Sequence, residues 1–163
     1  MKTIYLIGFM GCGKTTVAEI LCEKLDVTLI EMDSLIEKKE GRAIKEIFAE
    51  NGEAYFRKLE TALLEEIPLE NVVVSTGGGA PINPLNQKLM RRGTVIFLDA
   101  SFQVIQKRLS QDENRPLWKG KEQEKERLLQ ERWPIYQQAA DITIDVEDKS
   151  PERIADEILN VWK

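Results

Sequence analysis

MKTIYLIGFMGCGKTT, residues 1–16, joins a short apolar strand to a glycine-rich turn and the start of a helix. Residues 8–15 of this stretch match the pattern G-x-x-x-x-G-K-[ST]. Glycines allow a tight turn whose backbone N–H groups bind phosphate oxygens, assisted by the positive end of the helix dipole. In such a turn Lys14 reaches the β- and γ-phosphates, and the Thr15 hydroxyl ligates Mg²⁺. A purely structural turn requires neither residue, so the sequence predicts nucleotide binding through Gly11, Cys12, Gly13, Lys14, Thr15 and Thr16.

Length and composition indicate a single globular domain over residues 1–163. Hydrophobic residues make up 42% of the chain and charged residues 31%, both ordinary values. The net charge of −5 disfavours binding to nucleic acid, which depends on neutralising phosphates. No apolar run approaches the roughly 18 residues that span a bilayer, and the N-terminus lacks the pattern of a secretory signal. We therefore expect a monomer with neither a nucleic-acid nor a membrane partner.

The chain has two cysteines, Cys12 and Cys22, and no histidine. Cys12 lies inside the phosphate loop, where a disulfide would restrict the turn. Both cysteines are therefore interpreted as free thiols of a cytoplasmic protein. The absence of histidine excludes Ser-His-Asp hydrolysis, Cys-His nucleophiles and histidine-ligated zinc. General-base chemistry must then use a carboxylate.

Strand and helix patterns alternate along the chain. Short apolar runs that suit buried parallel strands occur at residues 4–7, 28–31, 72–75, 94–98 and 142–145. Helical patterns cover residues 14–25, 44–67 with a break near 51–52, 84–92, 101–109, 122–139 and the segment that opens at 150–152. This alternation predicts a three-layer α/β fold in which helices flank a five-stranded parallel sheet. The charged segment 111–126 predicts a mobile lid over the nucleotide, with a solvated loop as the alternative.

Candidate residues for a second site follow the predicted strands, because ligands of such folds bind beyond the carboxyl ends of the strands. They are the acidic pair Glu31 and Asp33, Arg57 between Glu53 and Glu60, the run STGGG at 75–79, and the run RWPIY at 132–136. Each has a simpler explanation. Asp33 could cap a helix, Arg57 could form an ordinary helical ion pair, and the triple glycine could be a flexible loop. Their joint occurrence beside a phosphate loop favours a binding site.

At this point the chain resembles the shikimate kinase family, a group of small P-loop kinases. The resemblance covers nearly the whole chain. It rests on GFMGCGKTT at 8–16, the acidic pair, Phe56-Arg57 with Glu60, STGGG, Arg-Pro-Leu at 115–117, and the R-x-P-x-Y run at 132–136. The family commonly has Asp where this chain has Glu31. The phosphate loop alone would indicate only a P-loop NTPase.

The resemblance implies transfer of the γ-phosphoryl group of ATP, with Mg²⁺, to a hydroxyl of shikimate, giving shikimate 3-phosphate and ADP. It implies a substrate-binding helical region at about residues 33–60. The catalytic residues would be Lys14, Asp33 as base or orienter of the attacking hydroxyl, and Arg115 on the lid. Arg115 would also contact the nucleotide.

The family likeness also implies the remaining contacts. The substrate would be bound by Asp33, by Arg57 and Arg132 as a clamp for its carboxylate, and by Gly78 and Gly79 beside its ring. Arg108 and Pro151 would flank the adenine, and Thr15 would be the metal ligand. These assignments agree with the chemistry, because guanidinium forks bind a planar carboxylate better than lysine does.

Two further interpretations stay open. The acceptor could be another hydroxy-acid such as gluconate, or a nucleoside monophosphate, because paired arginines also bind phosphate. Alternatively, the protein could be a nucleotide-dependent regulator that has lost catalysis. Loss of Lys14, Asp33 or a clamp arginine would mark such a protein, and all of these residues are present.

Overall fold

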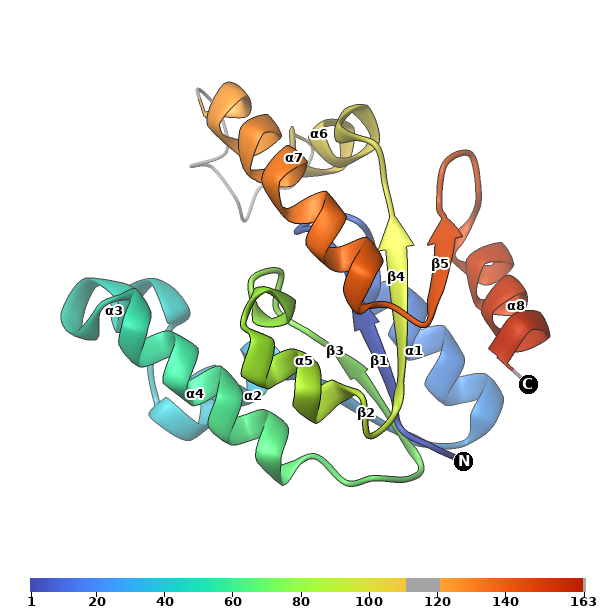
Figure 1. The fold of residues 1–163 in the computed structure, drawn as a ribbon, viewed down its shortest axis with the longest axis horizontal. Helices are drawn as coiled ribbons and strands as arrows, with labels where there is room; N and C mark the ends of the chain where they lie inside the picture. Colours follow the sequence, from blue (N-terminus) through green and yellow to red (C-terminus); the bar gives the residue numbers. More distant parts are fainter. Residues whose placement is uncertain (111–120, 163) are drawn as a thin grey trace.

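The computed structural model describes residues 1–110 and 121–162 and has three layers, with a sheet between two sets of helices (Figure 1). The sheet contains five parallel strands in the order β2-β3-β1-β4-β5. In chain order the strands are β1 Ile4–Ile7, β2 Thr28–Glu31, β3 Val72–Ser75, β4 Thr94–Asp99 and β5 Ile142–Asp145. The predicted α/β fold is confirmed, and β4 ends one residue later than expected.

Helices cover both faces of this sheet. On one face α1 (Lys14–Leu25) packs against α8 (Pro151–Trp162). On the other side lie α4 (Glu53–Glu66), α5 (Pro84–Met90) and α7 (Glu122–Ala139) (Figure 1). The helices α2 (Met32–Glu40) and α3 (Ile44–Asn51) pack against α4, and α6 (Phe102–Ser110) packs against α7. A short 3₁₀ turn, η1 (Ala80–Ile82), follows β3.

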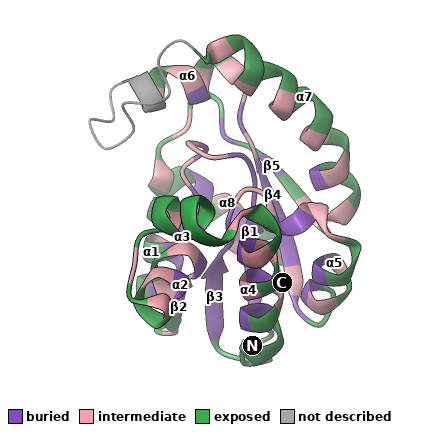
Figure 2. Cartoon of the chain, turned by 90° about the vertical axis from the view of Figure 1, so that its left-hand side faces the viewer, coloured by how far each residue is buried: buried purple, intermediate pink, exposed green. Residues whose placement is uncertain are grey.

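The core is built on the central strands. Every residue of β1 and of β3 is buried, which explains why these strands are continuous apolar runs rather than alternating ones. Figure 2 shows the buried strands beneath helices whose outer faces are exposed. The chain leaves β1 toward β2 on one side and later reaches β4 on the other. The carboxyl end of β1 is therefore the point at which such sheets bind ligands. Within residues 1–110 and 121–162, no helix combines the length and apolar character needed to cross a membrane.

Local details both confirm and correct the sequence-based expectations. The predicted break near 51–52 is confirmed, because α3 ends at Asn51 and Gly52 has a φ of 84°. Capping of α2 by Asp33 is wrong: the carboxylate of Glu31 accepts the Ser34 N–H at 2.9 Å. α5 ends at Met90 rather than at residue 92. Of the predicted lid, residues 111–120 lie outside the described residues, and residues 122–126 form the start of α7.

Candidate active site

The phosphate loop connects β1 to α1 and has the backbone that its sequence requires. Gly11 and Gly13 have φ angles of 81° and 94°, which residues with a Cβ rarely adopt. Gly13 is the N-cap of α1, so the first N–H groups of the helix are directed into the loop. The ammonium of Lys14 donates to the carbonyls of Gly8 at 2.5 Å and Phe9 at 3.1 Å. A charged amine is thus held at the position where phosphates would bind.

A cavity of about 1060 Å³ opens beside this loop. It brings together residues from separate parts of the sequence, as the fold predicts. The predicted site residues that line it are Gly11, Gly13, Lys14, Thr15, Thr16, Glu31, Asp33, Ser75, Thr76, Gly78, Arg108 and Pro151. Cys12 does not line the cavity: its side chain is buried, with Sγ 3.8 Å from Lys14 Nζ. Arg115 lies outside the described residues.

Two residues that line the cavity, Ile44 and Lys45, had no signal in the sequence, and the contact that places them there is made by Glu37, which follows the acidic pair. Glu37 from α2 accepts the N–H of Ile44 at 3.1 Å and so connects α2 to the first turn of α3. Ile44 and Lys45 then form part of the cavity wall. The contact between these two helices depends on how they pack, which spacing along the chain does not reveal. Arg57, Gly79 and Arg132 are not among the lining residues; Arg57 lines a smaller hollow of about 330 Å³ between α4 and α5.

Oxygen ligands suitable for a divalent cation lie at the phosphate end of the cavity. Thr15 Oγ1 is 3.3 Å from Ser75 Oγ, and both residues line the cavity beside Lys14. Within the described parts of the chain, no group of three or more His, Cys, Asp or Glu residues could hold a metal. Mg²⁺ commonly uses one or two protein oxygens together with waters and phosphate oxygens. The Thr15 hydroxyl therefore fits a magnesium ion that arrives with a nucleotide.

The glycine run after β3, residues 77–79, passes between the polar side chains predicted for the acceptor. A Cβ on Gly77 would lie 2.9 Å from Asp33 Oδ1, and a Cβ on Gly78 would lie 3.7 Å from Arg132 Nη1. A Cβ on Gly79 would collide with the guanidinium of Arg57. The structure therefore brings Asp33, Arg57 and Arg132 together around this run. A side chain at Gly77 or Gly79 would displace these polar groups from their present positions.

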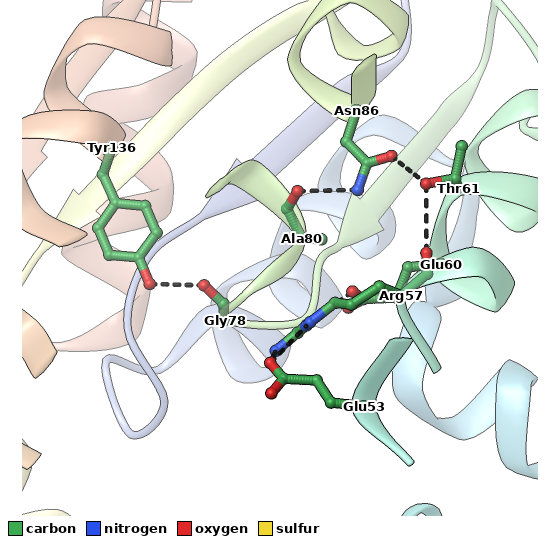
Figure 3. Close-up of polar contacts among 8 residues, drawn as sticks. All are labelled: Glu53, Arg57, Glu60, Thr61, Gly78, Ala80, Asn86 and Tyr136. Carbon is green, nitrogen blue, oxygen red and sulfur yellow. Dashed lines mark hydrogen bonds and ion pairs between the residues drawn. The ribbon is translucent and has the colours of Figure 1, made fainter. Parts of the chain in front are cut away.

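Arg57 is held by carboxylates on its own helix. Its guanidinium lies 3.2 Å from Glu53 Oε1 and 2.7 Å from Glu60 Oε1 (Figure 3). The Glu60 side chain is only 1% exposed, and its Oε2 has no hydrogen-bond partner among the described residues. Burial raises the pKa of Glu60, while the charge and hydrogen bond of Arg57 lower it. The helical ion pair considered from the sequence is therefore present, and it fixes the guanidinium beside Gly79.

The R-x-P-x-Y run lies on α7 and faces the glycine run. The Tyr136 hydroxyl donates to the Gly78 carbonyl at 2.5 Å, and the ring of Tyr136 packs on Phe97 with centroids 5.3 Å apart. One turn earlier, Arg132 Cζ lies 6.0 Å from the centre of the Phe9 ring in the phosphate loop. Burial raises the pKa of Tyr136 to about 12. The motif thus joins α7 to both the glycine run and the phosphate loop.

The pKa of Tyr136 predicts a loss of stability at alkaline pH. The folded protein favours the neutral Tyr136 phenol, which therefore contributes to the free energy of unfolding. This contribution is complete below the unfolded pKa of about 10 and is lost as the pH rises toward 12. We expect it to lower the free energy of unfolding by up to about 3 kcal/mol over that interval. Urea unfolding at pH 9 to 11.5 would measure this in wild type and in Tyr136→Phe. Equal pH dependence in the two proteins would contradict the prediction.

Comparisons with known proteins agree with this geometry. The shikimate kinase family model matches residues 10–163. The chain is 47% identical to a shikimate kinase of Sulfurihydrogenibium sp. (strain YO3AOP1), with 100% of this chain and 99% of that protein covered. A structure titled shikimate kinase from Acinetobacter baumannii in complex with shikimate has a TM-score of 0.92 and 36% identity, covering 99% of this chain and 93% of that one. The Aquifex aeolicus shikimate kinase has a TM-score of 0.84 and 42% identity, covering 98% and 95%. Its sequence and its fold together show that this chain belongs to the shikimate kinase family.

Proposed function

We propose that this protein transfers the γ-phosphoryl group of ATP to the 3-hydroxyl of shikimate, giving shikimate 3-phosphate and ADP. The observation that carries the proposal is the shared cavity. Lys14 in the phosphate loop and Asp33 at the start of α2 line the same space, and Gly78 completes its acceptor end. A phosphoryl donor and a hydroxyl acceptor can therefore meet in one enclosure, with two guanidinium groups beside the glycine run.

At the donor end, the loop N–H groups and Lys14 would bind the phosphates and stabilise the negative charge that develops on the leaving oxygen. Thr15 would ligate Mg²⁺, which supplies further positive charge and orients the phosphates when it is bound with ATP. Arg108, whose guanidinium lies against Gly13 of the phosphate loop, and Pro151 also line the cavity and would flank the adenine. Arg115 would bring another positive charge to the transferring group.

At the acceptor end, Asp33 would accept a hydrogen bond from the attacking hydroxyl and take its proton as the new P–O bond forms. Phosphoryl transfer has a loose transition state, so placement of the hydroxyl matters more than strong basicity. Arg57 and Arg132 would bind the substrate carboxylate through charge-assisted hydrogen bonds, with Gly78 and Gly79 against the ring. This clamp would hold the acceptor in line with the γ-phosphate.

A coupled ADP-release assay with Mg·ATP tests the proposal, with shikimate, gluconate and AMP as parallel acceptors. We expect ADP release that depends on shikimate and little with the other two. Preference for gluconate or AMP would retain a kinase but change its acceptor. ATP binding without turnover on any acceptor would favour a regulator. A monomeric state and a cytoplasmic location stay predictions, the latter resting on the two free, buried cysteines.

A further inference from the structure

The glycine run and the residue after it are held by side chains from two different helices. The Gly78 carbonyl accepts the Tyr136 hydroxyl of α7 at 2.5 Å, and the Ala80 carbonyl accepts the Asn86 side-chain N–H of α5 at 2.9 Å (Figure 3). Both Tyr136 and Asn86 are 0% exposed. No motif in the sequence singles out Asn86, and the activity proposed above uses neither hydrogen bond directly.

Asn86 is in turn connected to the helix that carries Arg57. The Thr61 hydroxyl lies 2.7 Å from Asn86 Oδ1 and 3.2 Å from the Arg57 carbonyl, and its single hydrogen favours the shorter contact. Thr61 is one helical turn beyond Arg57 on α4. A continuous polar chain therefore runs from α4 through Thr61 and Asn86 to the Ala80 carbonyl (Figure 3).

Tyr136 makes the equivalent connection on the opposite side. It is four residues after Arg132, so both side chains leave the same face of α7. Both meet the same residue: Tyr136 binds the Gly78 carbonyl, and Arg132 Nη1 lies 3.7 Å from the Cβ position of Gly78. The backbone between Gly78 and Ala80 is thus attached to the helix of each arginine of the proposed clamp.

We propose that Tyr136 and the Thr61–Asn86 pair are positioning residues that set the separation of Arg57 and Arg132 across the glycine run. This inference rests on the proposed function, because the two guanidinium groups must match one carboxylate. Bidentate binding is sensitive to geometry, and a misplacement of about 1 Å can reduce catalysis about a hundredfold. Neither Tyr136 nor Thr61 touches the acceptor in this assignment. Thr61 acts through the helix and backbone that it joins, and Tyr136 acts through the Gly78 carbonyl and through the direct interaction of its hydroxyl with Arg132.

Tyr136→Phe and Thr61→Val test the inference, because each removes one hydroxyl and keeps the shape of the side chain. We expect each variant to raise the KM for shikimate about 5- to 10-fold, because the two guanidinium groups would no longer be held at the separation that one carboxylate requires. The KM for ATP should change less than the KM for shikimate, because Gly78 packs beside Met10 of the phosphate loop but neither hydrogen bond is made to that loop. The KM for shikimate of the double variant should be higher than that of either single variant. Calorimetric titration with shikimate in the absence of ATP measures binding directly, and the dissociation constant of each variant should rise by the same factor as its KM.

Two matched controls separate positioning from loss of stability. Tyr5→Phe removes a buried hydroxyl in β1 that has no hydrogen-bond partner among the described residues, and Thr143→Val changes an exposed residue of β5. Both should leave the KM for shikimate unchanged. If the wild type is active and both Tyr136→Phe and Thr61→Val keep the wild-type KM and binding constant for shikimate, the inference is wrong and the proposed function stands. A wild type without shikimate-dependent ADP release would overturn the proposed function and the inference with it.

Discussion

Asp33→Asn is expected to bind both substrates and to lower kcat by about 10²- to 10⁴-fold, the usual contribution of a positioned general base. Asn keeps the shape of Asp and can still hydrogen-bond to the attacking hydroxyl, but it cannot accept the proton. Asp33 lines the cavity but is not part of the phosphate loop, so the loss should appear in turnover rather than in ATP binding. Steady-state kinetics with each substrate varied in turn, together with ATP titration, would measure the two effects separately.

Glu19→Gln provides the control for this variant. It makes the same change of charge on α1, at an exposed side chain that does not line the cavity, and should leave kcat within about twofold of wild type. A decrease of less than tenfold in Asp33→Asn would contradict proton transfer to Asp33. Its role would then be limited to orienting the hydroxyl. Equal unfolding midpoints for the two variants would show that the comparison is made between folded proteins.

Arg57→Ala is expected to have two large effects of different origin. Loss of charge-assisted hydrogen bonds to the substrate carboxylate should raise the KM for shikimate about 10- to 150-fold, with little change in the KM for ATP. The substitution also leaves Glu60, a fully buried carboxylate, without its counter-charge. Breaking a buried ion pair from one side costs about 3–5 kcal/mol. The free energy of unfolding at pH 7 should fall by about that amount.

The two effects can be separated by pH and by substitution. Without Arg57 the pKa of Glu60 should rise further, because burial already raises it and the opposing charge is gone. A raised folded pKa gives stability that is present at low pH and lost as pH rises, so the deficit of Arg57→Ala should be smaller at pH 5 than at pH 8. Arg57→Lys should recover most of the stability and little of the shikimate affinity, because lysine supplies charge without the fork. Equal increases of both KM values would show that Arg57 is only structural.

Much of the site could be predicted from the sequence because its determinants are local. The phosphate loop is one uninterrupted turn whose glycines, lysine and threonine act on the backbone and ligand beside them, so Gly11 and Gly13 have the φ angles that the motif requires. The five strands are short apolar runs, and such a run indicates a strand buried on both faces even when its neighbours in the sheet are unknown. The break at Gly52 is equally local.

Choices between neighbouring groups were decided only by tertiary structure. Glu31 rather than Asp33 caps α2, because Glu31 has the extended backbone of an N-cap residue and its carboxylate accepts the Ser34 N–H. Arg57 is both a helical ion-pair partner and a neighbour of the glycine run, a combination that neither interpretation of its spacing anticipated. The second outcome depends on how α4 is packed beside the glycine run.

The hydrogen bonds that hold the glycine run lie furthest from what sequence can reveal. Tyr136 and Gly78 are 58 positions apart, and Thr61 and Asn86 are 25 apart. Thr61 and Asn86 are ordinary members of helical patterns, and the motifs that contain Gly78 and Tyr136 do not show that these two residues meet. By itself the sequence determined the phosphate loop, the parallel sheet and the residue types of the acceptor site, because these follow from backbone conformation and hydrophobic periodicity. Only the tertiary structure decided which buried polar groups meet, because every such pairing requires the helices and the sheet to be packed first.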